Sequence, residues 1–430
     1  MTDRLDDSNT RLPDTDEYEP DVDAKPSLLK SRALRYTGLA LIGLLLLSVV
    51  QAITGTTELT SSGTWGAAIR LAIPIMLAGL GGLFSERSGV VNIGLEGMMI
   101  AGAWFGAWAG WSFGPWYGVV FGVIGGGIFG LIHAVATVTF AVDHIVSGVA
   151  INMLAAGAMR FMSVVIYSPE SGGGATQSPR IQSPIGTFNV PLLSDAFTWI
   201  EDQAIFFISD LAGVLAGFTT RMSWLTLVTL LIIPVTWWVL WRTAWGLRLR
   251  SCGENPYAAE SLGVPVLRMK YYGVVISGGL AGLGGAYLVV VQAGIYREGM
   301  TAGRGFIGLA SLIFGNWYPF GVAAGAAVFG YADALSLRQG TAVHALLLVA
   351  AIGLALLAAF SFTKKKTTAA IIQGVAAAFF LGWYLMTDTV ATQVIAALPY
   401  LVTLLVLSLA TQRLRMPAAD GLRYRKGEAV

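Results

Sequence analysis

The sequence predicts an all-α, polytopic transmembrane helical bundle with about 10–12 spans. Its 430 residues are 55% apolar and 12% charged, and the mean hydropathy is +0.68. Soluble domains average about 45–50% apolar and about 25% charged residues. The apolar runs also follow one another so closely that no separate soluble core can be delimited. We therefore expect one membrane domain, residues 27–430, in the inner or plasma membrane.

The first 26 residues are expected to form a disordered, cytoplasmic tail. They are rich in Asp and Glu and have almost no aliphatic side chains, a composition that cannot bury enough apolar surface to fold. Basic residues at Lys30, Arg32 and Arg35 then precede a run of membrane-spanning length. This order differs from that of a cleaved signal peptide, so the first run is expected to be an anchor.

The predicted spans follow from the rule that a helix needs about 17–25 mostly apolar residues to cross a bilayer. Seven clear runs lie at 36–53, 65–84, 91–111, 116–141, 145–166, 224–243 and 270–293. A short pair at 304–315 and 320–336 is hinged at Asn316-Trp317-Tyr318-Pro319. Three more runs lie at 341–361, 369–387 and 392–411.

The distribution of Lys and Arg predicts the topology, because short cytoplasmic loops collect these residues. Four basic clusters fall on one side: Lys30/Arg32/Arg35, Arg242/Arg248/Arg250 with Arg268/Lys270, Lys364–Lys366, and Arg413/Arg415 with Arg423/Arg425/Lys426. Both termini are thus expected in the cytoplasm, and the long segment 167–223 is expected to be an external loop. Because Arg297 and Arg304 fall outside in this scheme, 294–336 is compatible with either a spanning or a re-entrant pair.

Metal, redox and nucleic-acid functions lack the residues they need. A net charge of +2 is close to balanced and does not indicate nucleic-acid binding. The single cysteine, Cys252, excludes an intrachain disulfide, and three histidines (His133, His144 and His344) form no spacing typical of a metal site. We therefore expect no metal.

The glycines in the apolar runs indicate helix packing. Gly125, Gly127 and Gly130 satisfy a G-x-G-x-x-G pattern, but they follow no strand and have no acid about 20 residues later, as a dinucleotide fold requires. Small residues in membrane helices, including Gly278 and Gly282, instead let neighbouring helices approach closely. We therefore expect no cofactor.

The stretch 85–99 brings polar groups into a membrane helix. Glu96 is the most informative, since a charged side chain at a helix centre costs about 2.5–3.5 kcal/mol on insertion scales. Asn92 and Glu96 are four residues apart and are expected to share one helix face. Two interpretations stay open here: these side chains line a substrate path, or they only hydrogen-bond a neighbouring helix.

The loop 244–270 is predicted to contain a short helix on the cytoplasmic side. Asn255 can cap exposed backbone amides, Pro256 suits the first helical position, and Gly263 can end the helix after about two turns. A capped helix outside the membrane favours docking to a partner protein over a solvated surface turn.

These two stretches carry a resemblance to a known family. Residues 87–98 and 253–263 resemble parts of the permease subunits of ATP-binding-cassette importers that serve branched-chain amino acids, simple sugars and nucleosides. The first is similar to the signature of the nucleoside and simple-sugar branch, and the second to the family's coupling helix. A less specific similarity runs from Gly303 to Trp317. The resemblance covers about 60–336 and resumes at 398–401 and at Met416-Pro417, so 341–387 looks like a two-helix insertion.

The resemblance implies a permease that forms, with a second homologous permease, a path for a nucleoside or a simple sugar. An external solute-binding lipoprotein would deliver the solute, and a separate ATP-binding subunit would drive transport. The chain has no G-x-x-x-x-G-K-[ST] loop, so we expect it not to be an enzyme and ATP hydrolysis to belong to the partner. The predicted contacts with the ATPase are Glu254, Asn255, Pro256, Ala258, Ala259 and Gly263, and the predicted substrate path includes Asn92 and Glu96.

Two other classes of function would leave different signatures in the sequence. A secondary transporter of a small polar solute would use an intramembrane acid such as Glu96 with an ion gradient, and many such proteins contain inverted repeats; the sequence shows no convincing one. A membrane enzyme would need a catalytic constellation, and neither a Ser/His/Asp set nor a paired-carboxylate pattern stands out.

Overall fold

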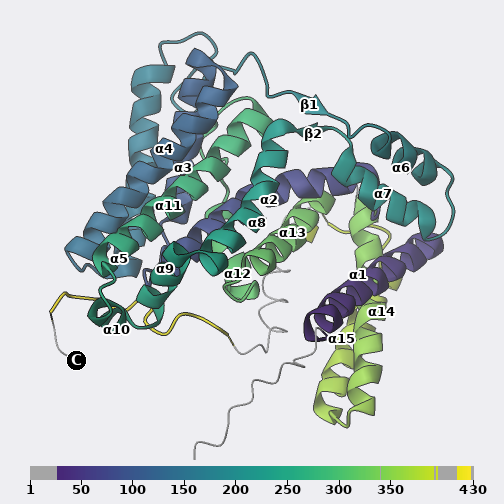
Figure 1. Cartoon of the computed structure of the whole chain (residues 1–430). Coiled ribbons are helices and arrows are strands. Elements are labelled where there is room, and N and C mark those ends of the chain that lie inside the picture. The colour runs from purple at the N-terminus through teal and green to yellow at the C-terminus, as the bar shows by residue number, and fades with distance from the viewer. Residues whose placement is uncertain (1–26, 339, 392–393, 396–413, 428–430) are drawn as a thin grey trace, which may run out of the picture.

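A computed structural model describes residues 27–338, 340–391, 394–395 and 414–427 (Figure 1). Most of these residues are helical and only two short strands occur among them, which confirms the all-α prediction. The helices are α1 (Ser27–Thr54), α2 (Ser62–Arg87), α3 (Leu95–Phe113), α4 (Pro115–Ala134), α5 (His144–Met162), α6 (Leu193–Asp202), α7 (Ile208–Thr219), α8 (Trp224–Arg242), α9 (Ala244–Glu254), α10 (Pro256–Ser261), α11 (Val266–Tyr287), α12 (Arg304–Phe314), α13 (Pro319–Ser336), α14 (Gly340–Thr363) and α15 (Thr367–Met386). Three of them continue as π-helical turns, at Val135–Thr139, Ser163–Tyr167 and Leu288–Ala293.

Seven helices in the described part of the chain are long and apolar enough to cross a membrane. They are α2, α4, α5, α8, α11, α14 and α15, with the π-helical turns that extend α4, α5 and α11. The helices α1, α3, α12 and α13 occupy the other predicted positions before residue 340. The run predicted at 392–411 lies almost wholly outside the described residues. The multi-pass architecture is therefore confirmed.

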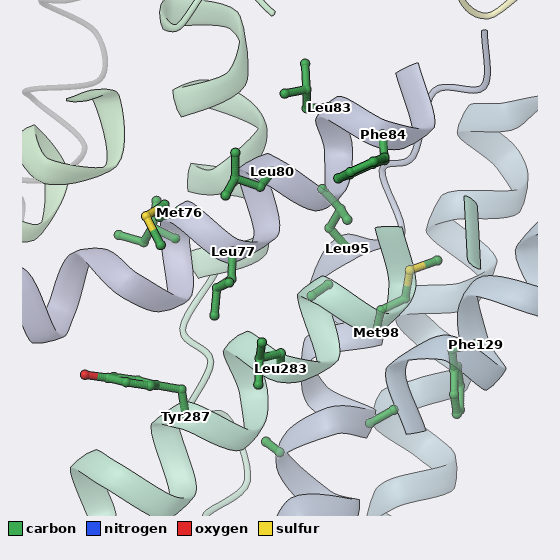
Figure 2. Close-up of a cluster of buried hydrophobic side chains, with 14 of the residues drawn as sticks. Met76, Leu77, Leu80, Leu83, Phe84, Leu95, Met98, Phe129, Leu283 and Tyr287 are labelled. Carbon is green, nitrogen blue, oxygen red and sulfur yellow. The ribbon is translucent and has the colours of Figure 1, made fainter. Parts of the chain in front are cut away.

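Helices α2 and α11 form the centre of the bundle. Helix α11 packs against α2, α3 and α4, and α2 also packs against α12 and α13. Figure 2 shows where these surfaces meet: Leu77 and Leu80 of α2 lie near Leu283 of α11, and Leu95 and Met98 of α3 lie beside them. Since both central helices are covered on most sides, their polar residues contact protein rather than lipid.

Glycines let α4 and α11 approach each other until their backbones touch. A Cβ atom added to Gly126 would lie 2.3 Å from the carbonyl oxygen of Gly278, and one added to Gly282 would lie 2.3 Å from that of Gly122. By contrast, a Cβ on Gly127 would have no neighbour within 4 Å. The predicted packing role of the glycines is confirmed for this crossing, which accommodates no larger side chain.

The loops gather at two opposite ends of the bundle. At one end, which we call the coupling face, lie Arg87 at the end of α2, the helices α9 and α10, and the turn between α12 and α13. At the other end, α6 and α7 lie in the chain between the strands β1 (Thr187–Phe188) and β2 (Met222–Ser223), which pair antiparallel. There Asp210 accepts hydrogen bonds from Gln51 and Thr60, so this loop packs on the ends of α1 and α2.

Helices α14 and α15 form a hairpin that projects from the rest of the bundle beside α1 (Figure 1). A small separate core joins them to it, through Val50, Leu59, Leu335, Ala345 and Leu348. The outer side of α15 leaves large apolar side chains exposed, as expected for helices surrounded by lipid. That these helices are an insertion into the family's architecture stays a prediction.

Candidate functional site

The connection between α2 and α3 contains a non-helical backbone segment deep in the bundle. After α2 ends at Arg87, residues 88–94 run back along it without helical hydrogen bonds, and α3 begins only at Leu95. The prediction of a helix from residue 91 was therefore wrong at its start. Asn92 precedes the helix, and the expectation that Asn92 and Glu96 share a helix face was wrong as well.

Side chains from distant helices replace the missing helical hydrogen bonds. The carbonyl of Gly89 accepts from Lys270 Nζ at 3.0 Å, that of Val90 from Ser85 Oγ at 2.6 Å, and that of Ile93 from Asn152 Nδ2 at 3.1 Å. The Asn152 amide oxygen also accepts from the backbone N–H of Gly97 at 2.7 Å. Irregular backbone at membrane depth is tolerated only when its polar groups are bonded in this way. The segment is thus a built feature of the fold.

Asn92 lies at the centre of this segment and is fully buried. Its Nδ2 donates to Ser277 Oγ of α11 at 2.8 Å, whereas its Oδ1 is buried without a hydrogen-bond donor among the described residues. An unpaired buried amide oxygen costs about 1–3 kcal/mol. Asn92 is therefore fixed to α11 and retains one free acceptor.

Glu96 caps a second helix that begins inside the bundle. Its Oε1 accepts from the backbone N–H of Gly303 at 2.9 Å, and its Oε2 accepts from that of Gly305 at 2.7 Å. These amides belong to the N-terminus of α12, where helical N–H groups have no intrahelical acceptor and the helix dipole favours a negative charge. The fit is close, because a Cβ on Gly305 would lie 2.5 Å from the Glu96 backbone nitrogen.

The structure thus gives Asn92 and Glu96 contacts within the chain, and their predicted place in the substrate path stays a prediction. Other polar residues in the spans also have partners: Asp333 pairs with Arg304 at 3.4 Å, and Arg160 pairs with Glu298. Sequence reasoning missed Asn152 and Ser277, which hold the 88–94 segment. An amide and a hydroxyl within apolar runs were the available signal.

The predicted short helix on the coupling face is α10. The Asn255 side chain accepts from the backbone N–H of Ala258 at 3.0 Å, Pro256 is the first helical residue, and Gly263 follows the helix with a φ of +80°. The predicted cap, start and stop are confirmed. Helix α9 precedes it directly and packs its buried residues, Leu249 and Cys252, against the bundle.

The predicted coupling residues divide into two groups. Glu254, Asn255, Ala258 and Gly263 are exposed, whereas Pro256 and Ala259 are buried against the chain itself. Sequence reasoning missed Leu262, which directly follows α10 and is 84% exposed. Pro256 and Ala259 pack α10 onto the chain itself, and that any of the six residues contacts an ATPase stays a prediction.

Residues 66–360 match the family of permease components of branched-chain amino acid transport systems. The chain belongs to this permease family. The match extends into α14 and contains both polar stretches described above. It confirms the resemblance derived from the motifs, and it makes the protein a transport component of the ATP-binding-cassette type.

Named relatives of the permease include transporters of several solutes. It is 38% identical to the guanosine ABC transporter permease protein NupQ of Bacillus subtilis, over 63% of this chain and 81% of the relative. It is 35% identical to the nucleoside ABC transporter permease protein NupC of Lactococcus lactis, over 62% and 80%. It is also 32% identical to a putative glucose ABC transporter permease protein of Haloferax volcanii, over 65% and 78%. No solved structure matches the permease at a significant level.

Proposed function

We propose that this permease forms, with a second homologous permease, the path by which a nucleoside or a simple sugar enters the cell. The observation that carries the proposal is the exposed, capped helix α10 on the coupling face, together with the membrane-spanning bundle above it. Support for the solute class comes from the two nucleoside permeases that are 35–38% identical over about four-fifths of their own lengths. An external solute-binding lipoprotein delivers the solute to the face formed by α6 and α7.

The energy source in this proposal is a separate ATPase subunit that docks on α10. The coupling face is then cytoplasmic, as are both termini. The acid that an ion-coupled transporter would use, Glu96, has both carboxylate oxygens occupied by backbone amides of α12. This arrangement favours the ATPase-driven mechanism over the alternative of a secondary transporter.

The test is a charge placed at the exposed edge of α10. Leu262→Glu leaves the fold intact, because the side chain is 84% exposed, but it places a carboxylate in the proposed docking surface. Losing an apolar contact at the centre of an interface costs about 2 kcal/mol, so we expect binding of the ATPase to weaken about 30-fold. The measurement is the affinity of the ATPase for the permease in nanodiscs, with solute-stimulated ATP hydrolysis as a second readout.

A matched control is Leu192→Glu, since Leu192 is 83% exposed and lies on the opposite face. It should leave the affinity for the ATPase unchanged. Wild-type affinity and normal stimulated hydrolysis in Leu262→Glu would refute docking on α10. The solute class is tested by a binding assay on the receptor that supplies this permease, with guanosine, glucose and a branched-chain amino acid as ligands. Saturation by the amino acid alone would overturn the proposed solute class.

A further inference from the structure

The last described segment of the chain, residues 414–427, lies across the coupling face; we call it the strap. Figure 1 shows it, in yellow, running along α9 and α10. Its Ala419 donates a backbone hydrogen bond to the Gly253 carbonyl at 2.8 Å, and the N–H of Ala418 donates to Glu254 Oε2 at 3.2 Å. The strap therefore bonds directly to the residues that precede α10.

The strap also contacts the other turns of this face. The backbone N–H of Arg415 donates to Asn316 Oδ1 at 2.6 Å, in the turn between α12 and α13. The rings of Tyr424 and Tyr257 pack edge to face with centroids 5.2 Å apart, and Arg423 lies 4.0 Å from Asp143, between α4 and α5. One segment thus joins α10 to the turn between α12 and α13 and to the connection between α4 and α5.

Asp420 anchors the strap in an unusual way. Both of its carboxylate oxygens are buried, and no basic, hydroxyl or amide side chain among the described residues bonds to them; the backbone N–H of Gly421 lies close enough to lower the pKa of the group. Asp420 is in hydrogen-bonding contact with another acid, Glu86, near the end of α2. The Glu86 carboxyl also accepts a hydrogen bond from Trp317 Nε1. Two carboxylates cannot hydrogen-bond to each other, so the contact requires one proton between them.

The titratable groups around the acid pair come from α2, α5, α9 and α11. Arg87 pairs with Glu254 at 3.5 Å. Lys270, near the start of α11, is a buried cation that faces Asp420. Arg250 and Cys252 of α9 and His144 of α5 face Arg87 or Lys270. Burial and the neighbouring Glu86 carboxyl both raise the pKa of Asp420, which favours its protonated form.

The outer side of the strap extends the surface around α10. Leu422 is 60% exposed, Met416 is exposed as well, and both lie on the same face as Leu262. A partner that docks on α10 would also meet these apolar side chains, because the strap runs along α9 and α10 (Figure 1). The strap and α10 are held together by the bonds from Ala418 and Ala419, so they present one surface.

We propose that the strap and α10 form one docking surface for the ATPase subunit, and that Asp420 positions the strap through a proton shared with Glu86. The assignment of the partner rests on the proposed function. The seating of the strap does not, and it can be measured without any ATPase. A proton between the two acids makes the seat sensitive to pH. The strap stays bound to the coupling face while the two acids share a proton. As the pH rises and the proton is lost, two adjacent negative charges form and the binding of the strap weakens.

The first experiment uses the chain's single cysteine as a probe. Cys252 is fully buried next to Gly253, which binds the strap. We compare the rate of maleimide labelling in the full-length permease for wild type, Asp420→Ala and Asp420→Asn. Alanine removes the bond to Glu86, and labelling should accelerate at least about tenfold at neutral pH. Asparagine donates an N–H in place of the proton, so labelling should stay at the wild-type rate.

The pH profile separates a shared proton from a simple packing role. Between about pH 6 and about pH 9, the labelling rate of wild type divided by that of Asp420→Asn should rise, because only wild type loses the proton and both contain the same thiol. Asp143→Asn is the matched control, since Asp143 meets the strap only at the surface. A flat ratio, or labelling of Asp420→Ala at the wild-type rate, would overturn the shared proton.

The second experiment tests the partner. With the strap released in Asp420→Ala, the affinity for the ATPase should fall at least about tenfold, whereas Asp420→Asn should bind normally. Normal affinity in Asp420→Ala with accelerated labelling would overturn the strap's part in docking and leave α10 untouched. Normal affinity in Leu262→Glu would instead overturn docking on α10, whatever the labelling shows, so the two failures are distinguishable.

Discussion

Replacing Glu96 distinguishes a structural cap from a substrate contact. The carboxylate accepts two backbone hydrogen bonds, from Gly303 at 2.9 Å and Gly305 at 2.7 Å, and it is 8% exposed. Hydrogen bonds to a charged group contribute about 1.5–3 kcal/mol each. Glu96→Ala removes both and should lower the free energy of unfolding by about 3–6 kcal/mol. Glu96→Gln keeps one acceptor oxygen but turns an N–H₂ group toward the other amide, so it should cost about 2–3 kcal/mol.

The assay is unfolding of the purified permease by titration with sodium dodecyl sulfate, followed by tryptophan fluorescence. Uptake of several solutes is measured on the same variants in liposomes that contain the complete transporter. Glu298→Gln is the control, because its pair with Arg160 is exposed and contributes less than about 1 kcal/mol. If Glu96 is a cap, both variants unfold more easily and uptake falls by a similar factor for every solute. Wild-type unfolding of Glu96→Gln, with a raised KM for one solute, would refute the cap as its main role.

Two further predictions concern the packing of α4 on α11 and the buried thiol. Gly126→Ala should lower the free energy of unfolding by about 1–3 kcal/mol, because its Cβ would lie 2.3 Å from the Gly278 carbonyl oxygen. Gly127→Ala is the control: its Cβ would have no neighbour within 4 Å, so the free energy of unfolding should change by less than about 0.5 kcal/mol. Equal effects of the two substitutions in the same titration would contradict the close contact of α4 with α11. Burial raises the pKa of the Cys252 thiol to about 11, so the thiolate that reacts with maleimide is scarce at neutral pH. Native protein should label far more slowly than protein unfolded in detergent, and equal rates would exclude the buried position.

The positions of most long helices could be predicted because membrane spans obey a local rule. A run of apolar residues of sufficient length marks a span wherever its neighbours lie, and most predicted runs agree with observed helices to within a few residues. The start of α3 was predicted too early for a reason that is not local. Residues 91–94 are apolar enough to be helical, but Lys270 and Asn152 bind backbone carbonyls at Gly89 and Ile93, on either side of Asn92, and hold this segment in a non-helical conformation.

The partners of the polar residues could not be predicted, because they come from far along the chain. Glu96 meets amides 207 and 209 residues away, and no spacing pattern indicates such a contact. By contrast, the cap, start and stop of α10 lie within nine residues and were predicted correctly. Asp420 left one signal that was not used. It is an acid in a stretch otherwise charged by arginine and lysine, next to Met416-Pro417.

The two polar stretches recognised in the sequence form one continuous unit in the structure. A Cβ on Gly253, at the end of α9, would lie 2.4 Å from the Arg87 carbonyl oxygen, and one on Gly89 would lie 3.2 Å from that of Cys252. The backbone before α10 thus rests directly on the beginning of the 88–94 segment, which leads in seven residues to the Glu96 cap of α12.

Such close backbone contact leaves no void in which a displacement of α10 could be absorbed. Under the proposed function, a motion imposed by the ATPase on α10 would therefore reach the non-helical segment. That segment leads directly to the Glu96 carboxylate, which accepts hydrogen bonds from both amides at the N-terminus of α12. A motion of the segment would therefore act on the position of α12 through these two bonds. This explains why a costly stretch of irregular backbone lies between the docking helix and a helix that begins inside the membrane.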